Sequence, residues 1–193
     1  MKQRADAAKQ PPYRSSLRYI SRMLKTLELA GFFTAHAVLC ICGGDPYQPS
    51  TITELADGSR EINVFNDIDG ARWGRRFFAD NPNGADRAVL VMDGYVTLEG
   101  WRTDALIVEA RLYRGATEEW KLTLPYAPVK KPKGLAKLFG SKPNTFKVYR
   151  PKFMFGTEST PDEQRALGEA FFRGVDSHKE GSAVWNKHLD QSR

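Results

Sequence analysis

Four charged residues in the middle of the chain have types and a spacing that suit metal-dependent hydrolysis: Asp93, Asp104, Glu109 and Arg111. Asp93 falls in one β-prone segment, and the other three fall in the next segment. Carboxylates can hold a divalent ion that activates water, while a nearby cation stabilises the charge that develops on a phosphate. Arg111 suits the second role, but it stays charged and is a poor proton-transfer group.

An acidic residue on one strand followed by Glu-x-Arg on the next loosely resembles the metal-binding core of the PD-(D/E)xK nuclease superfamily. In that superfamily a lysine occupies the position of Arg111. The resemblance covers only these few positions and implies a metal-dependent nuclease-like enzyme. The alternation of polar and apolar residues around Glu109 is equally typical of a half-exposed strand. The nuclease hypothesis requires Asp93 or Asp104 to lie near Glu109, and carboxylates on opposite faces of a sheet would exclude it.

A second group of chemically capable residues is His36, Cys40 and Cys42. If this run is an extended strand, these even-numbered residues share one face and could hold zinc or copper. A fourth ligand is not nearby in the sequence, and cysteine is among the most frequently buried residues. We therefore expect neither a metal nor another cofactor. Two closely spaced cysteines do not make a disulfide framework, and reduced thiols indicate a cytoplasmic protein.

The charge of the chain is concentrated in two segments. Residues 129–152 carry eight Lys or Arg residues and no acidic residue, and residues 1–25 carry seven basic side chains and one acid. Because the whole chain has a net charge of +6 and these segments together carry +14, the remaining residues carry −8. Basic segments on an otherwise acidic protein indicate an anionic partner.

The Lys-rich segment, residues 129–152, connects two β-prone segments, and connections of this length are uncommon unless they are functional or disordered. At the end of this segment and just beyond it, Phe146, Tyr149, Phe153 and Phe155 alternate with Lys147, Arg150 and Lys152, which suits single-stranded nucleic acid. Its apolar cluster (Leu135, Leu138 and Phe139) suits a groove on an acidic protein or, less well, a lipid headgroup region. A solvated loop kept for solubility is the alternative interpretation.

These observations predict a binding protein, not an enzyme, that engages an acidic protein surface or nucleic acid. The predicted partner-binding residues are Lys130, Lys131, Lys133, Leu135, Lys137, Leu138, Phe139, Lys142, Lys147, Tyr149, Arg150 and Lys152. A second predicted surface is the basic face of the first helix, formed by Arg14, Arg18, Arg22 and Lys25. Exposed sheet edges would also allow a homo-oligomer.

The hydrophobic pattern predicts the elements that position these residues. Leucine and isoleucine at helical spacing predict a first helix that stops at Gly31, and the apolar run up to Cys42 reads as an interior strand or as more helix. Residues 50–65 read as a hairpin, and residues 69–81 as a short helix. Three β-rich segments follow, 87–100, 103–115 and 117–128, and predict an antiparallel meander. Asp93-Gly94 reads as a tight turn or as a bulge within one long strand, and the flanking lengths favour the bulge.

The third of these segments places four large residues on one face: Trp120, Leu122, Leu124 and Tyr126. Near the C-terminus, Thr160, Pro161 and Glu163 have the spacing of a capping box and predict the start of a helix. The expected fold class is α+β, an antiparallel meander flanked by an N-terminal amphipathic helix and a C-terminal helix. We expect a flexible basic arm over residues 1–13 and a single domain over residues 14–193, with a basic loop at 129–144.

Overall fold

The computed structural model describes residues 17–98, 100–114, 118–129, 145–154 and 159–192. The described helices are α1 (Leu17–Ile41), α2 (Gly70–Asp80), α4 (Pro161–Ser177) and α5 (Lys179–His188). The strands are β1 (Ser50–Glu54), β2 (Arg60–Val64), β3 (Arg87–Leu98), β4 (Trp101–Leu112), β5 (Glu118–Ala127), β6 (Lys147–Val148) and β7 (Lys152–Met154). The predicted arm and residues 130–144 of the basic loop lie outside the described residues.

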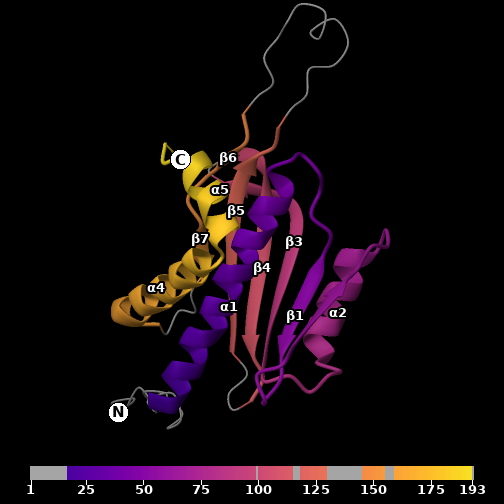
Figure 1. The fold of residues 1–193 in the computed structure, drawn as a ribbon, viewed down its shortest axis with the longest axis vertical. Coiled ribbons are helices and arrows are strands. Elements are labelled where there is room, and N and C mark those ends of the chain that lie inside the picture. Colours follow the sequence, from indigo (N-terminus) through magenta and orange to yellow (C-terminus); the bar gives the residue numbers. More distant parts are fainter. Residues whose placement is uncertain (1–16, 99, 115–117, 130–144, 155–158, 193) are drawn as a thin grey trace, which may run out of the picture.

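The strands form one antiparallel sheet in the order β2-β1-β3-β4-β5-β6, and β7 also pairs with β5 (Figure 1). The predicted meander corresponds to β3, β4 and β5, and the predicted hairpin corresponds to β1 and β2. The pairing of β3 with β4 continues in one register from Arg87 opposite Leu112 to Leu98 opposite Trp101. The predicted bulge at Asp93-Gly94 is therefore wrong, and the long strand is regular there.

The two faces of the sheet bury different helices. One face carries Val89 and Val91 of β3 and the even-numbered apolar residues of β4 and β5, and it forms a single hydrophobic core with α1, α4 and α5. The four predicted residues of β5, Trp120, Leu122, Leu124 and Tyr126, all belong to this core. On the opposite face, Leu90 and Met92 pack with Phe78 of α2. The predicted α+β architecture is confirmed, with helices on both faces of the antiparallel sheet.

The first helix does not stop at Gly31 but continues to Ile41, so the alternative of an interior strand after Gly31 is wrong. Gly31 lies where α1 meets α4. A Cβ atom at this position would lie 1.9 Å from the carbonyl oxygen of Phe171. Gly174 of α4 makes the reciprocal contact, since its Cβ would lie 1.9 Å from the carbonyl oxygen of Glu28. Gly31 therefore allows α1 and α4 to pack closely and does not end the helix.

Among the described residues, α1 is the one helix that is long and apolar enough to cross a membrane by length and composition. The apolar window has a mean hydropathy of 1.4, and 61% of it is buried inside the protein. Side chains such as Leu27, Ala30 and Val38 belong to the core shared with the sheet and α4. The apolar character of α1 is accounted for by this packing.

The glycine contacts between α1 and α4 predict a large difference between similar substitutions. Gly31→Ala and Gly174→Ala should each lower the free energy of unfolding by about 1–3 kcal/mol, because the added methyl group must push two helix backbones apart. Gly168→Ala is the matched control in α4, where a Cβ would meet nothing within 4 Å. This control should be neutral or stabilising by about 0.5–1 kcal/mol. Urea unfolding measures all three, and equal effects at the three positions would contradict the packing.

Candidate functional site

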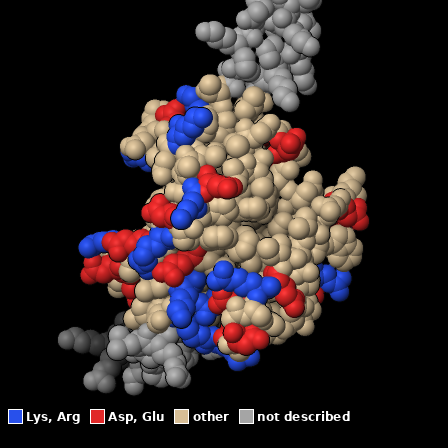
Figure 2. All heavy atoms as spheres, in the orientation of Figure 1, with Lys and Arg blue, Asp and Glu red and all other residues tan. Residues whose placement is uncertain are grey.

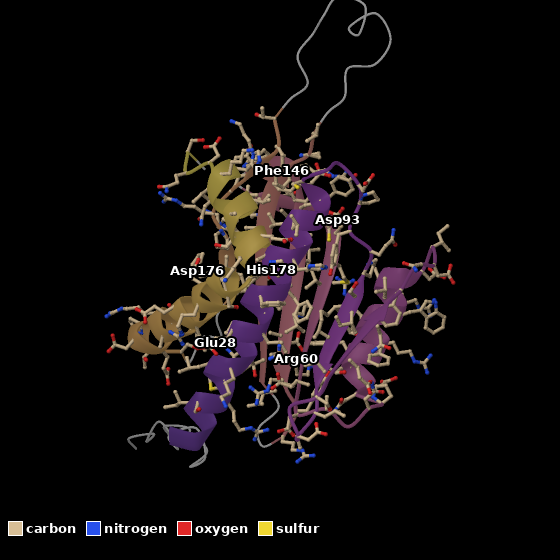
Figure 3. All side chains as sticks on the ribbon, in the orientation of Figure 1. Glu28, Arg60, Asp93, Phe146, Asp176 and His178 are labelled. Carbon is tan, nitrogen blue, oxygen red and sulfur yellow. The ribbon has the colours of Figure 1, made fainter. Side chains whose placement is uncertain are left out.

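Asp93 and Asp104 lie on the sheet face that packs against α1. Asp93 accepts a hydrogen bond of 2.7 Å from the hydroxyl of Tyr126, a core residue of β5, and Asp104 is the strand neighbour of Tyr126. Burial, together with the neighbouring Asp104, raises the pKa of Asp93, while the bond from Tyr126 opposes that change. Burial and the Asp93 carboxylate raise the pKa of Tyr126. Figure 3 places Asp93 toward the end of the sheet at which α1 ends.

Glu109 and Arg111 lie on the opposite face, on the side of α2. Glu109 is 3.5 Å from Arg75 of α2 and 3.7 Å from Lys121 of β5. Arg111 pairs with Glu119, and its guanidinium lies 4.7 Å from the ring centre of Phe78 and 5.7 Å from that of Tyr113. Both residues therefore belong to a charged network that attaches α2 to the sheet.

The four residues of the nuclease hypothesis do not come together. Asp93 and Asp104 point toward α1, whereas Glu109 and Arg111 point toward α2. One metal ion cannot be bound from both faces of a sheet. The described residues also contain no group of three or more His, Cys, Asp or Glu side chains that could hold a metal ion. The geometry therefore contradicts the nuclease-like arrangement.

The expected common face of His36, Cys40 and Cys42 is wrong, because these residues are on a helix or at its end. His36 and Cys40 are one turn apart, with Nε2 of His36 3.7 Å from Sγ of Cys40. Cys42 points elsewhere and donates its thiol hydrogen to the carbonyl of Leu39 at 3.0 Å. The partner that the sequence did not indicate is His178, whose Nε2 is 3.3 Å from Nδ1 of His36.

Most of the Lys-rich segment lies between β5 and β6, which are adjacent antiparallel strands. Tyr126 and Ala127 of β5 pair with Val148 and Lys147 of β6. The predicted binding residues at 130, 131, 133, 135, 137, 138, 139 and 142 lie outside the described residues. In the described part, Lys147 pairs with Asp190 at 2.8 Å.

The other basic residues at the end of the segment are exposed, whereas the described aromatic residues there and just beyond it are buried or half-buried. Arg150 and Lys152 are exposed, and Arg150 donates to Gln191 at 3.3 Å. Phe146 is 3% exposed and Tyr149 is 8% exposed, so neither ring is available to stack on a base. Phe153 is half-buried against Phe171 and Phe172, and Phe155 lies outside the described residues.

The predicted basic helix face is only partly present among the described side chains. Arg14 and the side chain of Arg18 lie outside them. Arg22 donates to the carbonyl of Arg114 at 3.0 Å and lies 3.6 Å from Asp86, while Lys25 is exposed. Basic and acidic atoms alternate over this region in Figure 2. Because α1 runs along the sheet from its N-terminal end to the end where β6 lies, the first described turns of α1 and strand β6 are at opposite ends of the sheet (Figure 1).

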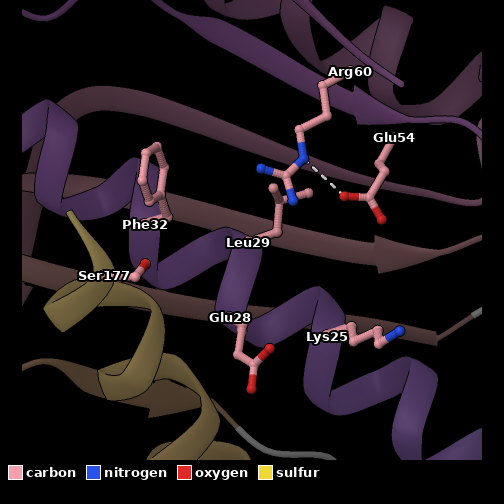
Figure 4. Close-up of a pocket in the computed structure, with 7 residues that line it drawn as sticks. All are labelled: Lys25, Glu28, Leu29, Phe32, Glu54, Arg60 and Ser177. Atoms are coloured by element: carbon pink, nitrogen blue, oxygen red, sulfur yellow. Dashed lines mark hydrogen bonds and ion pairs between the residues drawn. The ribbon is translucent and has the colours of Figure 1, made fainter. Parts of the chain in front are cut away.

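A hollow of about 330 Å³ lies between α1, the end of α4 and the β1–β2 hairpin (Figure 4). Its lining residues are Lys25, Glu28, Leu29, Phe32, Glu54, Arg60 and Ser177. Arg60 pairs with Glu54 at 2.8 Å, and Glu28 pairs with Arg173 at 3.0 Å. Sequence reasoning missed this hollow because its walls come from four separate elements. Its charges are largely paired with one another, and it contains no catalytic constellation.

Comparison of the chain with models of known protein families, with curated proteins and with solved structures found no match.

The Tyr126–Asp93 contact gives a prediction with a defined pH dependence. Tyr126→Phe should lower the free energy of unfolding by about 1–2 kcal/mol at pH 7, because it leaves a half-buried carboxylate without its hydroxyl donor. Loss of that donor also raises the pKa of Asp93 further, since the hydrogen bond favours the charged form. The stability difference between the variant and the wild type should therefore narrow as the pH falls through the pKa of Asp93.

Urea unfolding at several pH values and NMR titration of the Asp93 carboxyl group measure both effects. Tyr95→Phe is the control, since the side chain of Tyr95 is 62% exposed. A pKa of Asp93 that does not change in Tyr126→Phe would contradict the contact.

Proposed function

We propose that the protein is a binding protein that uses the Lys-rich segment to engage an acidic surface of another protein. The observation that carries the proposal is the combination of charge and position. Eight basic residues and no acidic residue occur within residues 129–152, and the strands on either side of residues 130–146, β5 and β6, pair at one end of the sheet through Ala127 and Lys147. Charge concentrated at one end of a structured domain favours fast, oriented association with an oppositely charged partner.

The scaffold holds the two ends of the segment by several contacts. The side chain of Val129 packs against the hydrophobic core at the start. Where the chain re-enters the sheet in β6, Val148 is fully buried, and its carbonyl accepts a hydrogen bond of 2.8 Å from the backbone N–H of Asp190. Entry and exit of the segment are therefore defined by the fold, which lowers the ordering cost of binding.

An acidic protein is a better partner than single-stranded nucleic acid because of the aromatic residues. Stacking of bases needs exposed rings. Phe146 and Tyr149 are buried, and Phe153 packs on the aromatic residues of α4. In contrast, the apolar cluster Leu135, Leu138 and Phe139 offers side chains that suit a groove on a protein. The carboxylates of Asp93 and Glu109 are engaged in structural contacts, so we assign binding and not catalysis.

The proposal predicts selective binding of acidic peptides. A labelled 20-residue peptide that alternates aspartate and leucine should bind the wild-type protein more tightly than single- or double-stranded oligonucleotides do at 150 mM salt. Lys130, Lys131, Lys133 and Lys137 changed together to Gln should weaken peptide binding about tenfold or more, which corresponds to 1.4 kcal/mol. Fluorescence anisotropy at 50 and 150 mM salt measures these affinities.

The control variant removes the same charge from other elements of the fold. Arg72, Arg76, Arg165 and Lys179 are exposed and lie on α2, α4 and the start of α5. Their simultaneous change to Gln should leave peptide affinity within about twofold, because they are not part of the proposed binding segment and general charge effects are screened at 150 mM salt. Equal losses in both variants would refute a specific site. Tighter binding of oligonucleotides than of the peptide would replace the protein partner by nucleic acid.

A further inference from the structure

His36 of α1 and His178, the residue between α4 and α5, form a contact pair, the His36–His178 pair. Nδ1 of His36 is 3.3 Å from Nε2 of His178, and the ring centres are 5.4 Å apart. His178 also caps α5, because its Nδ1 accepts a hydrogen bond of 3.0 Å from the backbone N–H of Gly181. The two rings therefore join α1 to the first turn of α5.

These contacts determine where the protons of the neutral pair lie. A ring nitrogen that accepts a hydrogen bond carries no proton, so neutral His178 has its proton on Nε2. This proton is donated to Nδ1 of His36, which leaves the proton of His36 on Nε2. Nε2 of His36 faces Sγ of Cys40 at 3.7 Å. In the neutral state both accepting nitrogens are thus occupied by donors.

An additional proton cannot enter this arrangement without breaking a bond. Protonation of His178 at Nδ1 removes the acceptor of the Gly181 N–H. Protonation of His36 at Nδ1 sets its N–H against the N–H of His178. Burial, followed by the neighbouring His178, lowers the pKa of His36 below its ordinary value of 6.5. The stability that neutral His36 contributes to the folded protein is therefore complete above about pH 6.5. It is lost as the pH falls through the lowered pKa of His36.

The surroundings offer no compensation for an added positive charge. The titratable groups nearest to the pair along the chain are Cys40, one turn after His36, and Asp176, Lys179 and Glu180, which flank His178. Asp176 accepts a hydrogen bond from the hydroxyl of Ser182 at 3.3 Å. In the part of the chain that the structure describes, neither imidazole pairs with a carboxylate. The rings instead contact Phe32 and Phe33.

Helix α5, which His178 caps, contacts β6, the strand that follows residues 130–144 of the Lys-rich segment. At its start, Gly181 lies directly on α1, since a Cβ there would be 2.3 Å from the carbonyl oxygen of Ala35. At its end, Leu189 bridges to Val148 of β6, and Asp190 pairs with Lys147. The position of β6 thus depends on α5, and α5 depends at its first turn on the histidine pair.

We propose that the His36–His178 pair is a pH-sensitive latch: below about pH 6.5, proton uptake releases the first turn of α5 from α1 and loosens β6. The release of α5 follows from the geometry alone. Its consequence for partner binding, a weaker grip of the Lys-rich segment on its partner at low pH, rests on the proposed function.

Amide hydrogen exchange between pH 7.5 and 5.5 tests the latch in the full chain. Protection factors, which correct for the pH dependence of intrinsic exchange, should fall in α5 by about tenfold per pH unit below pH 6.5 if one proton is taken up on opening. Those of α2, on the other face of the sheet, should change much less. His178→Asn keeps an oxygen acceptor for the Gly181 N–H and does not titrate, since Asn is a favourable N-cap. In this variant a proton on His36 no longer breaks the cap of α5, so the protection of α5 should depend on pH much less than in the wild type.

His188→Gln is the matched control at the other end of α5. Nδ1 of His188 is 3.1 Å from the carbonyl oxygen of Phe146, to which it can only donate, and a protonated ring still donates. This variant should therefore retain the pH response of the wild type. Constant protection of α5 in the wild type, or an equal fall in His178→Asn, would overturn the latch.

Binding of the aspartate–leucine peptide at the two pH values tests the link to function. The dissociation constant of the wild type should rise at least about threefold from pH 7.5 to 5.5 and stay constant in His178→Asn. If α5 is released but the affinity does not change, the regulatory part is refuted. If the peptide binds at neither pH, the proposed function fails, and hydrogen exchange still decides the latch independently.

Discussion

At two positions along α1 the main chains of neighbouring helices touch, because Gly31 meets the carbonyl of Phe171 and Gly174 meets that of Glu28. A third contact brings Gly181 of α5 onto the carbonyl of Ala35. Close approach of this kind places the side chains around the crossings in contact with one another, which is why α1, α4 and α5 share one hydrophobic core with the sheet. The position of α5, and through it the position of β6 and the histidine pair, depends on these glycines.

The charged residues that suggest catalysis have structural partners in the folded protein. Glu109 and Arg111 attach α2 to the sheet through Arg75, Glu119 and the ring of Phe78. Asp93 is held by the hydroxyl of Tyr126. A half-buried charge needs such partners, since desolvation is costly without them. The proposed function therefore rests on the charges of the Lys-rich segment and not on those inside the fold.

Patterns over a few neighbouring residues correctly predicted the elements that depend on local interactions. The capping box of Thr160 and Glu163 starts α4 as expected. Turn residues and alternating patterns correctly predicted the β1–β2 hairpin and the three long strands. The predicted end of the first helix at Gly31 is wrong, because a helix can include a glycine where close packing offsets its unfavourable helix propensity of about 1 kcal/mol. The predicted bulge at Asp93-Gly94 is wrong because β3 continues in one register with β4 through these residues.

The amino-acid order determines the α+β class, the segregation of basic residues into 129–152 and the alternation that places four large residues on one face of β5, because these depend on composition and on residues a few positions apart. Only the tertiary structure decides which sheet face each residue of the predicted metal site occupies, and which residues separated by 142 positions meet, as His36 and His178 do. Strand register and helix crossing are set by the packing of the whole core, and no short stretch of sequence contains that information.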